Sequence, residues 1–577
     1  MAKRTKKLQP IIWRAILPLG VSLGLVACKT SYYQEKADKE VYQIIEEVEN
    51  QVFGKKSPFT IDTPYSDRNP SEIEPEEIID ERDDIQETQL TIQQAIDLAI
   101  THSRDYQTQK EALYLTALSL AGEKWEFSPQ FFAGSTLSRD RSSNGDQSGS
   151  ARSRVTVGQA LTTGASLGAT LANDLMRFYT GDPRRTAAST LSVNIFQPLL
   201  RGAGNLVARE PLRQAERNTI YAIRDFTQFQ RQFSIDIVSQ FYNLLQQRDI
   251  VRNRFADYQS RTNATARLLN RFEAGLETVV GVGQARQAEL SSRNGYVNQV
   301  ASYQTQLDQF KIRLGIPLTH KLQLDDTELN SLAEAGLKET YLPSDWAFSV
   351  ATTNHLELLN DIDGFEDARR QVKIAANRLR PGLDFFADAS VSSDQPTDYT
   401  SFDIDDVRAG AGVEIDLPIN RYRERNQYRA TVVSFERAVR TLSLALDQKR
   451  NQIERGLRTL NQLRENYRIE TLSVALAEER VTSTDLNIEA GRAVVFDLVQ
   501  AQDALIAAKN NLSAALVSYL SARLQLLLDI GILDTDIEAY WLKSSPTLIP
   551  IPSNGPESDE SEELEVITPD ILFKVTS

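Results

Sequence analysis

The sequence has very few of the residues that carry most enzyme and metal chemistry. It contains one cysteine and three histidines in 577 residues, and the histidines (His102, His320 and His355) lie far apart along the chain. A single cysteine excludes a disulfide framework and every multi-cysteine metal or iron–sulfur site. Neither a P-loop nor an H-E-x-x-H motif occurs in the sequence. We therefore expect no catalytic residues, no metal and no cofactor, and we do not expect an enzyme.

Basic residues and chain breakers are also scarce. The 64 lysines and arginines are outnumbered by 79 aspartates and glutamates, which gives a formal net charge of −15. Nucleic-acid binding needs a cationic surface that neutralises phosphates, so the charge argues against a nucleic-acid partner. There are only 20 prolines and 27 glycines, and the stretches that lack them are informative.

The N-terminus has the features of an export signal. A basic segment that contains Lys3, Arg4, Lys6 and Lys7 precedes an apolar stretch that runs to Ala27. This stretch is too short and too interrupted for a comfortable membrane span. It ends in Leu25-Val26-Ala27-Cys28, which resembles a bacterial lipoprotein signal. The resemblance implies that residues 1–27 are removed and that Cys28 carries a lipid. An ordinary secretory signal with an incidental cysteine is the alternative, and the chain is exported in either case.

Acidic segments flank the body of the chain. Residues 28–88 contain nine carboxylates between Glu72 and Glu87, and four prolines lie around them. Self-repelling sequence with few core residues is expected to stay extended or mobile, so we interpret residues 28–88 as a tether. Residues 534–577 form a tail of the same character.

The body of the chain is a duplication. Glu273-Ala274-Gly275 recurs as Glu489-Ala490-Gly491, and Leu314-Gly315-Ile316 recurs as Ile530-Gly531-Ile532, both with an offset of 216. An earlier set, in which Pro129 matches Pro381, has an offset of 252. We therefore expect a first repeat over residues 89–320, a connection over 321–341 and a second repeat over 342–533.

Each repeat is predicted to contain long helices. No proline occurs between Pro211 and Pro317 or between Pro418 and Pro546. In the second gap apolar residues recur every seven positions, at Val432, Val439, Leu446, Ile453, Leu460, Tyr467, Val474, Val481 and Ile488. The first repeat carries this pattern 216 residues earlier, with a lapse at Thr265, over the positions Ile237, Leu244, Val251, Tyr258 and Phe272. This period predicts coiled-coil packing, and a helix from 421 to 488 would be roughly 100 Å long.

Strands are predicted between the helices, over about 129–198 in the first repeat and 381–418 in the second. Leu191, Val193 and Ile195 alternate with polar residues, and the segments 383–391 and 407–417 alternate in the same way apart from Phe386. Strands of about ten residues with one apolar face are typical of a transmembrane β-barrel. One subunit offers too few strands to close a barrel, so closure implies an oligomer.

The two offsets also predict the number of strands. Between Pro129 and Gly275 the first repeat is 36 residues longer than the second, which is about the size of one additional hairpin with its loop. The excess contains Val155-Thr156-Val157, a turn at 162–165, and apolar residues in alternation at Leu167, Ala169 and Leu171. Six strands per subunit are therefore predicted, and a long ordered loop is the alternative.

Taken together, these features resemble the TolC-type outer-membrane efflux family. The specific elements are a Leu-x-x-x-x-Ala-x-x-x-Ala opening (Leu90 to Ala99), the prolines before the first strands, the segment Gln197-Pro198-Leu199-Leu200-Arg201-Gly202, and the hairpin from Glu489 to Ala501. The resemblance implies an α+β membrane protein, a homotrimer of duplicated helix–strands–helix units. Its outer-membrane β-barrel would continue as a long periplasmic α-helical barrel. The family usually has four strands per subunit.

The resemblance also implies a function and partners. A trimeric channel would conduct substrate passively across the periplasm and outer membrane in a tripartite efflux or type I secretion system. Its partners would be a periplasmic adaptor and an inner-membrane pump or ABC transporter, besides the outer-membrane lipid. The expected location is the outer membrane of a Gram-negative-type bacterium, with a lipid anchor and a periplasmic helical extension. The sequence does not indicate the substrate, since specificity usually lies in the pump.

Roles for the hairpin tips follow from the same resemblance. The residues that would contact the adaptor are Glu273, Ala274 and Gly275 in the first repeat and Glu489, Ala490, Gly491 and Arg492 in the second. Turn geometry alone also explains the two glycines. Asp497 matches a carboxylate that faces the tunnel constriction in related channels, where three copies would form a ring that favours cations. Gln500 replaces the second acidic residue and Gly281 is the equivalent of Asp497, so the ring would be weaker. A solvated carboxylate is the alternative.

The main alternative function is that of a structural coiled-coil lipoprotein that bridges the layers of the envelope. Such a protein explains the seven-residue period and the lipid signal. It explains neither the alternating strands nor the duplication.

Overall fold

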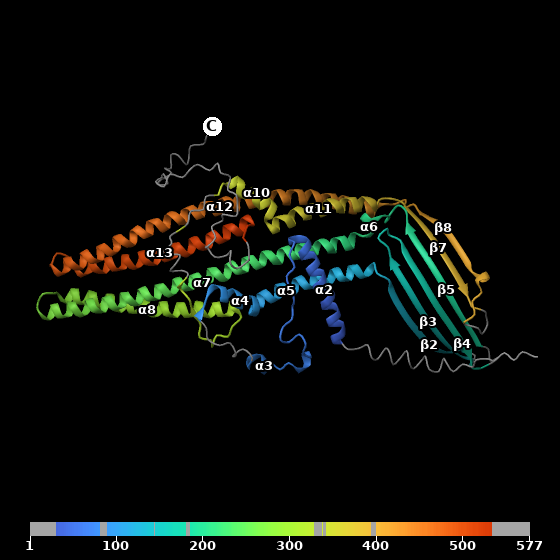
Figure 1. Ribbon diagram of the computed structural model, residues 1–577, viewed down its shortest axis with the longest axis horizontal. Coiled ribbons are helices and arrows are strands. Elements are labelled where there is room, and N and C mark those ends of the chain that lie inside the picture. The colour runs from blue at the N-terminus through green and yellow to red at the C-terminus, as the bar shows by residue number, and fades with distance from the viewer. Residues whose placement is uncertain are drawn as a thin grey trace, which may run out of the picture.

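The chain is elongated, with a β-sheet at one end and two long helical hairpins at the other (Figure 1). The computed structural model describes residues 30–80, 89–143, 145–180, 185–327, 337, 342–393 and 400–533. The signal segment 1–27, Cys28 and the tail 534–577 lie outside the described residues, so what the sequence indicates for them stays a prediction.

Six strands form one sheet in the order β2-β3-β4-β5-β7-β8, and every neighbouring pair is antiparallel. They are β2 (Gln130–Arg141), β3 (Gln147–Ala160), β4 (Ser166–Phe178), β5 (Arg185–Pro198), β7 (Gly382–Ser392) and β8 (Arg408–Asp416). The first repeat supplies four strands and the second supplies two. The prediction of six strands is confirmed, and the additional residues of the first repeat form the β3–β4 hairpin.

The sheet of a single chain is open and does not form a barrel. β2 and β8 are its edges, because each pairs with only one other of the described strands. Its six strands are fewer than the about eight that enclose a side-chain-filled interior in a membrane-type barrel.

The pairing register divides the sheet into two chemically different faces. Odd-numbered residues pair with odd-numbered residues throughout; for example, Val155 pairs with Leu171, which pairs with Leu191. This odd face is largely apolar from Phe131 on β2 to Ile415 on β8. The even face carries the carboxylates of the strands, among them Asp174, Asp384, Asp388 and Glu414, together with arginines such as Arg152 and Arg154, whereas the charges of the odd face are arginines at its end away from the helices. One face therefore suits lipid and the other suits water.

Three polar residues, Ser153, Asn173 and Ser189, lie side by side on neighbouring strands of the odd face and are hydrogen-bonded to one another. Asn173 on β4 accepts a hydrogen bond from Ser189 Oγ at 2.6 Å and donates one to Ser153 Oγ at 3.5 Å. The amide is thus paired within the sheet, which reduces the penalty of turning it toward an apolar medium.

The segment after β5 ties the β3–β4 hairpin to the rest of the sheet. Thr163, in the turn between β3 and β4, donates to Gln197 Oε1 at 3.2 Å, and its carbonyl accepts from Gly204 N at 3.0 Å. Arg201 pairs with Asp416 at the end of β8 at 2.7 Å. The segment 197–204 therefore connects the additional hairpin with the last strand of the second repeat.

Four long helices form the two hairpins (Figure 1). α7 (Glu210–Glu273) has 64 residues and α12 (Tyr422–Glu489) has 68, and they return as the 36-residue helices α8 (Val279–Leu314) and α13 (Val495–Ile530). At about 1.5 Å per residue α12 extends roughly 100 Å, which confirms the predicted rod. α13 is apolar enough to span a membrane, but 56% of its most apolar window is buried in the fold.

The seven-residue pattern is buried only in part. Ile237 and Leu244 on α7 and Ile453 and Leu460 on α12 are buried as predicted. The lapse at Thr265 is also buried, and its hydroxyl donates to the Ala285 carbonyl at 3.3 Å. Nearer the start of α12, Val439 is 44% exposed. One chain therefore leaves part of the α12 pattern uncovered.

The shorter helices of the two repeats form equivalent joints with the rods. α4 (Ile92–His102) leads into α5 (Arg104–Glu126), and α10 (Ser344–Asn354) leads into α11 (Leu356–Asn377). Gly315 ends α8 with φ 80°, so close to His102 that a Cβ atom would collide with the His102 carbonyl. Gly531 ends α13 with φ 82° in the same relation to Asn354. Both glycines are required by their backbone angle and by this close approach.

An apolar core fills the middle of the molecule. Leu90, Ile237, Phe310 and Leu516 belong to one buried cluster, which therefore contains α13 of the second repeat together with α4, α7 and α8 of the first. β1 (Gln89–Leu90) and β6 (Gln323–Leu324) form a short parallel ladder that bounds this core. The short helix α6 (Asn205–Ala208) precedes α7.

The interpretation of residues 28–88 as a mobile tether is wrong for much of the segment. Residues Thr30–Phe53 form helix α2, whose Val41, Ile44 and Ile45 are buried in a cluster with residues of α5 and α7. Tyr114 on α5 donates to Asp38 at 2.6 Å. The 3-10 turn η1 (Pro70–Glu72) and the helix α3 (Pro75–Asp80) follow. The acidic average of the segment concealed an amphipathic helix, because only its last third is crowded with carboxylates.

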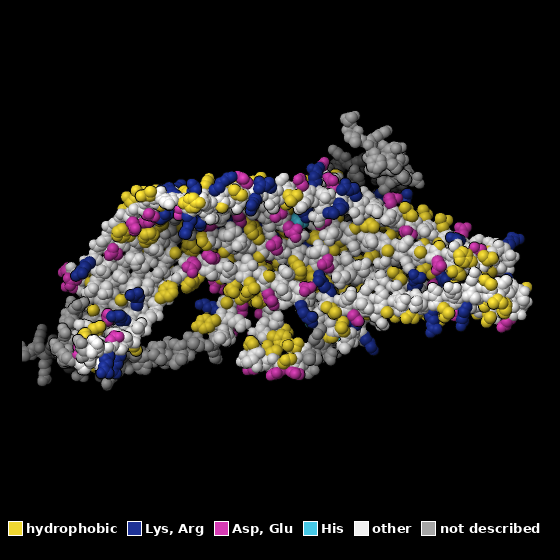
Figure 2. Space-filling view, turned by 180° about the vertical axis from the view of Figure 1, so that it is seen from behind, with side chains coloured by type: hydrophobic (Ala, Val, Ile, Leu, Met, Phe, Trp, Pro, Cys, Tyr) yellow, Lys and Arg dark blue, Asp and Glu magenta, His cyan; other side chains and the backbone are white. Residues whose placement is uncertain are grey.

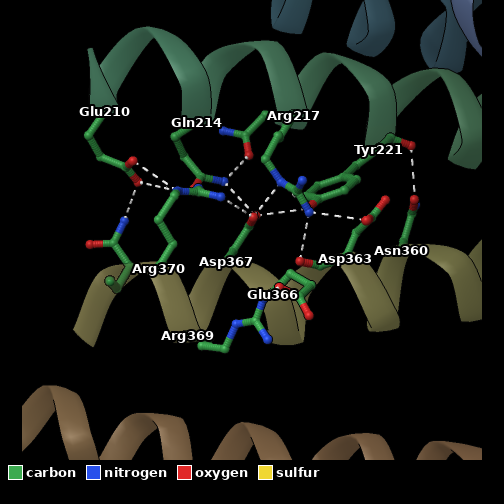
Figure 3. Close-up of polar contacts among 12 residues, drawn as sticks. Glu210, Gln214, Arg217, Tyr221, Asn360, Asp363, Glu366, Asp367, Arg369 and Arg370 are labelled. Carbon is green, nitrogen blue, oxygen red and sulfur yellow. Dashed lines mark hydrogen bonds and ion pairs between the residues drawn. The ribbon is translucent and has the colours of Figure 1, made fainter. Parts of the chain in front are cut away.

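A buried polar network joins α7 of the first repeat to α11 of the second (Figure 3). Arg370 donates to Glu210 Oε2 at 2.9 Å, to Asp367 at 2.8 Å and to Gln214 Oε1 at 2.7 Å. On the next turns of α7, Arg217 pairs with Asp363 and Asp367, and Tyr221 donates to Asp367 at 2.8 Å. The carboxylates and guanidinium groups of this network thus compensate one another across the two repeats.

We predict that Arg370→Met destabilises the protein by about 3 kcal/mol or more, because Glu210 and Asp367 would stay buried with fewer positive partners. The measurement is the midpoint of thermal unfolding followed by circular dichroism. Arg369→Met is the matched control, since Arg369 is exposed and, among the described residues, forms an ion pair only with Glu366 of its own helix. Equal effects of the two variants would contradict the assigned role of the network.

Candidate functional site

The predicted docking residues lie at the tips of the two hairpins, far from the sheet (Figure 1). α7 ends at Glu273, and Ala274 and Gly275 form the turn to α8. Gly275 has φ 73°, and the equivalent Gly491 has φ 71°. A Cβ atom at either glycine would meet nothing within 4 Å, so the backbone angle, and not space, favours glycine here.

Backbone hydrogen bonds close both tips in the same way. Leu276 N donates to Arg271 O and Arg492 N donates to Asn487 O, each at 2.8 Å. These bonds satisfy carbonyl groups that the end of a helix leaves free. The duplicated Glu-Ala-Gly sequence thus specifies two rigid turns that lie next to each other.

Exposed apolar side chains surround these turns, and the sequence interpretation missed them. The exposed fractions are 68% for Leu276, 70% for Val279, 69% for Val280, 63% for Val494 and 54% for Phe496. Figure 2 shows hydrophobic side chains among the charged ones at this end of the rods. An exposed apolar patch at the end of a soluble rod is typical of a protein interaction site. The signal in the sequence was the pair of apolar runs Val279-Val280 and Val494-Val495-Phe496, which directly follow the polar turns.

Asp497 has a structural role in this conformation. Its carboxylate accepts a hydrogen bond from Val494 N at 3.2 Å, so it satisfies a free amide at the start of α13. In the first repeat Thr278 caps α8, where its hydroxyl accepts from Gly281 N at 3.0 Å. Gln500 is exposed one turn farther along α13. The start of α8 is therefore capped by Thr278, and Gly281, the equivalent of Asp497, takes no part through a side chain.

A cavity of about 330 Å³ lies between the two hairpins just behind the tips. Its lining comes from both repeats: Ala264, Arg267, Leu268, Asn270 and Arg271 of α7, and Asp485, Ile488, Glu489 and Leu498 of the second hairpin. Arg267 and Asp485 pair across it at 3.4 Å, and both are substantially exposed. This pair contributes about 1 kcal/mol at most, because solvent screens it.

Side-chain hydrogen bonds connect α7 and α13 from the tips to the central core. Arg261 contacts Asp503 at 2.6 Å, Gln502 donates to Ser260 at 3.0 Å, and Asn253 donates to Asn510 at 2.9 Å. Arg261 also pairs at 2.7 Å with Asp257, which is buried. Burial raises the pKa of Asp257, and the Arg261 guanidinium partly opposes that rise. The hairpins are thus joined near the tips by polar contacts and by the small apolar cluster of Leu268, Ala285 and Val495, and in the middle by the apolar core.

The even face of the sheet is the other candidate surface. Arg152 and Asp174 pair across β3 and β4 at 3.2 Å, and Asp384 lies directly opposite Glu414 on β7 and β8. A face with charges of both signs, backed by an apolar opposite face, is what the wall of a water-filled pore requires.

The chain contains one string that matches a hydrolase motif, Gly164-Ala165-Ser166-Leu167-Gly168. In hydrolases the serine of G-x-S-x-G sits on a turn between a strand and a helix. Here Ser166 begins β4 after a turn between two strands. The match therefore lacks the context that its chemistry needs.

The fold can be compared with known proteins. No model of a known protein family matches the sequence, and no curated protein matches it. Several solved structures match the fold with high probability. CusC, whose structures concern transmembrane channel formation, is 12% identical with a TM-score of 0.58 over 76% of this chain and 92% of that one.

Two further structures give the same result. VceC, an outer-membrane protein of Vibrio cholerae, is 16% identical with a TM-score of 0.56, over 76% of this chain and 96% of that one. The outer-membrane channel CmeC of Campylobacter jejuni is 14% identical with a TM-score of 0.55, over 76% of this chain and 85% of that one. The chain has the TolC-type outer-membrane channel fold. The resemblance drawn from the sequence is thus confirmed for the fold, and the similar structures are channel proteins rather than enzymes.

Within this channel fold, we predict that Arg261→Met loosens the junction of the two hairpins. The buried Asp257 would lose its cation and Asp503 its partner on α7, a loss of about 2 to 3 kcal/mol. Amide hydrogen exchange should become at least about tenfold faster in the tip halves of α7 and α13, since 1.4 kcal/mol corresponds to a factor of ten.

The control is Arg286→Met, because Arg286 is 65% exposed and its one ion pair within the described part of the chain is with Glu289 on its own helix. Unchanged exchange in the Arg261 variant would show that the polar contacts do not hold the hairpins together.

Proposed function

We propose that three copies of the chain form a channel through the outer membrane. The observation that carries this proposal is the open sheet with one continuous apolar face and two unpaired edges. In a lipid bilayer every backbone polar group needs an internal partner, so an open sheet must close with other copies. The number of strands is even and all neighbours are antiparallel, so β8 of one copy would run antiparallel to β2 of the next.

The barrel would contain eighteen strands, six from each of three copies. Barrels with sixteen to eighteen strands leave an aqueous channel, whereas about eight strands are filled by side chains. The even face, with Arg152, Asp174 and Asp384, would line this channel, and the odd face would contact lipid. The additional β3–β4 hairpin therefore widens the pore by two strands per subunit.

The helical hairpins would continue the wall of the channel into the periplasm. On α12, large apolar residues are exposed on a single chain at Val439, Leu444, Ile469, Leu472, Leu476 and Leu486. Packing against the rods of neighbouring copies would cover them, as coiled-coil helices cover an apolar seam. Substrate would then pass by passive conduction, delivered by an inner-membrane pump or ABC transporter through a periplasmic adaptor. The channel would belong to an efflux or type I secretion system, and the lipid on Cys28 would add an anchor in the outer membrane.

A structural lipoprotein of the envelope remains the alternative function. It would use the rods and the lipid signal, but it has no use for a sheet with one apolar and one charged face. Planar-bilayer recording on the purified full-length protein distinguishes the two: we expect stable stepwise conductance, and a non-conducting monomeric rod would support the alternative.

For the gate, we propose that Asp497 and Gln500 line the narrowest part of the channel at the tips. Asp497→Asn should lower the preference for cations over anions by about twofold or more, because a ring of three carboxylates would lose its charge. The asparagine oxygen can still accept from Val494 N, so the start of α13 is preserved. Reversal-potential measurements in a salt gradient give the result.

Glu479→Gln on the exposed surface of α12 is the control for this change of charge. If ion selectivity were the same in both variants and in the unmodified channel, Asp497 would have no place in the gate.

For the adaptor, we propose that both tips dock onto it through Glu273, Ala274 and Gly275, through Glu489 to Arg492, and through the apolar residues beside them. The double change Val280→Asp with Phe496→Asp should reduce photocross-linking from position 276 to the adaptor at least about tenfold, because it places charge in an apolar contact. Thermal stability should change little, since both side chains are exposed.

Gln284→Asp with Gln287→Asp is the matched control, because it adds the same charge at exposed polar positions farther along α8. Cross-linking that survives in the tip variant, or that falls equally in the control, would contradict docking at the tips.

A further inference from the structure

Four arginines gather on the odd face of the sheet at the end away from the helices. Arg139 and Arg141 lie at the end of β2, Arg177 at the end of β4 and Arg185 at the start of β5. All four are exposed and odd-numbered, so they share the face that carries the apolar residues. β2, β4 and β5 lie side by side with β3 in this sheet (Figure 1), and the helices join the strands at their opposite ends.

Tyr179 organises this cluster. The register places Gly149 on β3 between Arg139 and Arg177. The Tyr179 ring lies over this glycine, where a Cβ atom would be 3.0 Å from ring carbon Cε2. The guanidinium carbons of Arg139 and Arg177 lie 5.8 Å and 5.4 Å from the ring centroid, so both cations contact the same ring. The missing side chain at Gly149 thus allows one tyrosine to hold two arginines.

Within the described residues the cluster has no anionic partner. Among the described residues no carboxylate forms an ion pair with any of the four arginines, and Arg139 donates instead to the neutral Gln147 at 2.7 Å. Arg177 and Arg185 are directly opposite each other on β4 and β5. Like charges in that position repel and destabilise the strand pair unless an anion lies between them. The nearby acidic residues of these strands, Asp140 and Asp174, are even-numbered and lie on the other face.

The position of the cluster identifies the kind of anion. Leu137 precedes Arg139 by two residues and Leu175 precedes Arg177 by two, so both leucines lie on the odd face, closer to the helices. They belong to the apolar part of that face, which we call the apolar band. The arginines therefore lie just beyond the apolar band, at the level of lipid head groups, at the end of the sheet that would face the outside of the cell. Aromatic residues mark this level in membrane barrels, and Tyr179 is 55% exposed there.

We propose that Arg139, Arg141, Arg177 and Arg185, organised by Tyr179, form a binding site for anionic, phosphate-bearing lipids of the outer leaflet. Guanidinium groups bind phosphate oxygens through paired hydrogen bonds, and clustered arginines at a membrane surface attract anionic head groups. The bound phosphates would separate Arg177 from Arg185 and neutralise the cluster. This inference rests on the proposed function, because it needs the odd face to contact lipid.

The test uses the full-length protein and a mixture of lipids of known composition. The protein is purified in neutral detergent and incubated with equal amounts of phosphatidylglycerol and phosphatidylcholine, and native mass spectrometry records which lipid stays bound. We expect the unmodified protein to retain the anionic lipid preferentially. In the double variant Arg139→Gln with Arg177→Gln, the ratio of bound phosphatidylglycerol to bound phosphatidylcholine should fall at least about fivefold.

The matched control is Arg154→Gln with Arg408→Gln, which removes the same charge from exposed positions of the even face. The preference should survive there. The lipid site is overturned if the Arg139→Gln, Arg177→Gln variant prefers the anionic lipid as strongly as the unmodified protein does. It is also overturned if the control variant loses the preference to the same extent. Complete displacement of the lipid by inorganic phosphate at millimolar concentration also overturns it, since a free anion would then be the ligand.

Conductance in planar bilayers separates this inference from the proposed function. A variant that conducts normally while its lipid preference stays unchanged contradicts only the lipid site. An unmodified protein that does not conduct contradicts the channel itself, and the lipid site with it.

Discussion

Two rows of backbone amide and carbonyl groups, along β2 and β8, have no partner strand in the described part of the chain. In water such edges would be solvated, but the apolar odd face from Phe131 to Ile415 is unsuited to water. In lipid the apolar face has a suitable medium. The backbone groups of the two edge strands then lack hydrogen-bond partners, because the bilayer core offers none. Closure by further copies of the chain satisfies both requirements. The open sheet is therefore the constraint on which the proposed oligomerisation, membrane location and pore formation depend.

The duplication explains how the rest of the chain is built around that sheet. Each repeat has a short helix, a helix that leads into strands, and a rod that returns to a glycine-terminated end, at Gly315 or Gly531. The repeats are joined by buried charges near the sheet, by an apolar core in the middle and by hydrogen-bonded side chains toward the tips. Toward the tips the junction also contains a small apolar cluster of Leu268, Ala285 and Val495, so it combines polar and apolar contacts there.

Much of the fold could be predicted from the sequence because its signals are periodic and long. The alternation of apolar and polar residues predicted the strands, and the seven-residue apolar period with the proline-free gaps predicted the long helices. The difference between the two repeat offsets predicted the additional hairpin. The average composition of residues 28–88 led to a wrong prediction. The carboxylates near Glu77 dominate that average, whereas the apolar positions of α2, such as Val41 and Ile44, lie outside the acidic stretch. The tip surface was only half identified, since the glycines are recognisable by their repetition whereas the exposure of Val279 and Phe496 depends on where the turns lie. The contacts of Arg139 and Arg177 with Tyr179 depend on strand register, which no local pattern specifies.

The proposed trimeric channel is tested most directly by the number of strands that close its barrel. Electron cryo-microscopy of the full-length protein in lipid nanodiscs measures this without labels or partners. The predicted result is a three-fold symmetric particle with eighteen strands around a water-filled pore, in which β8 of each copy pairs with β2 of the next. A particle in which β2 and β8 stay unpaired, or in which β3 and β4 lie outside the barrel wall, would contradict it.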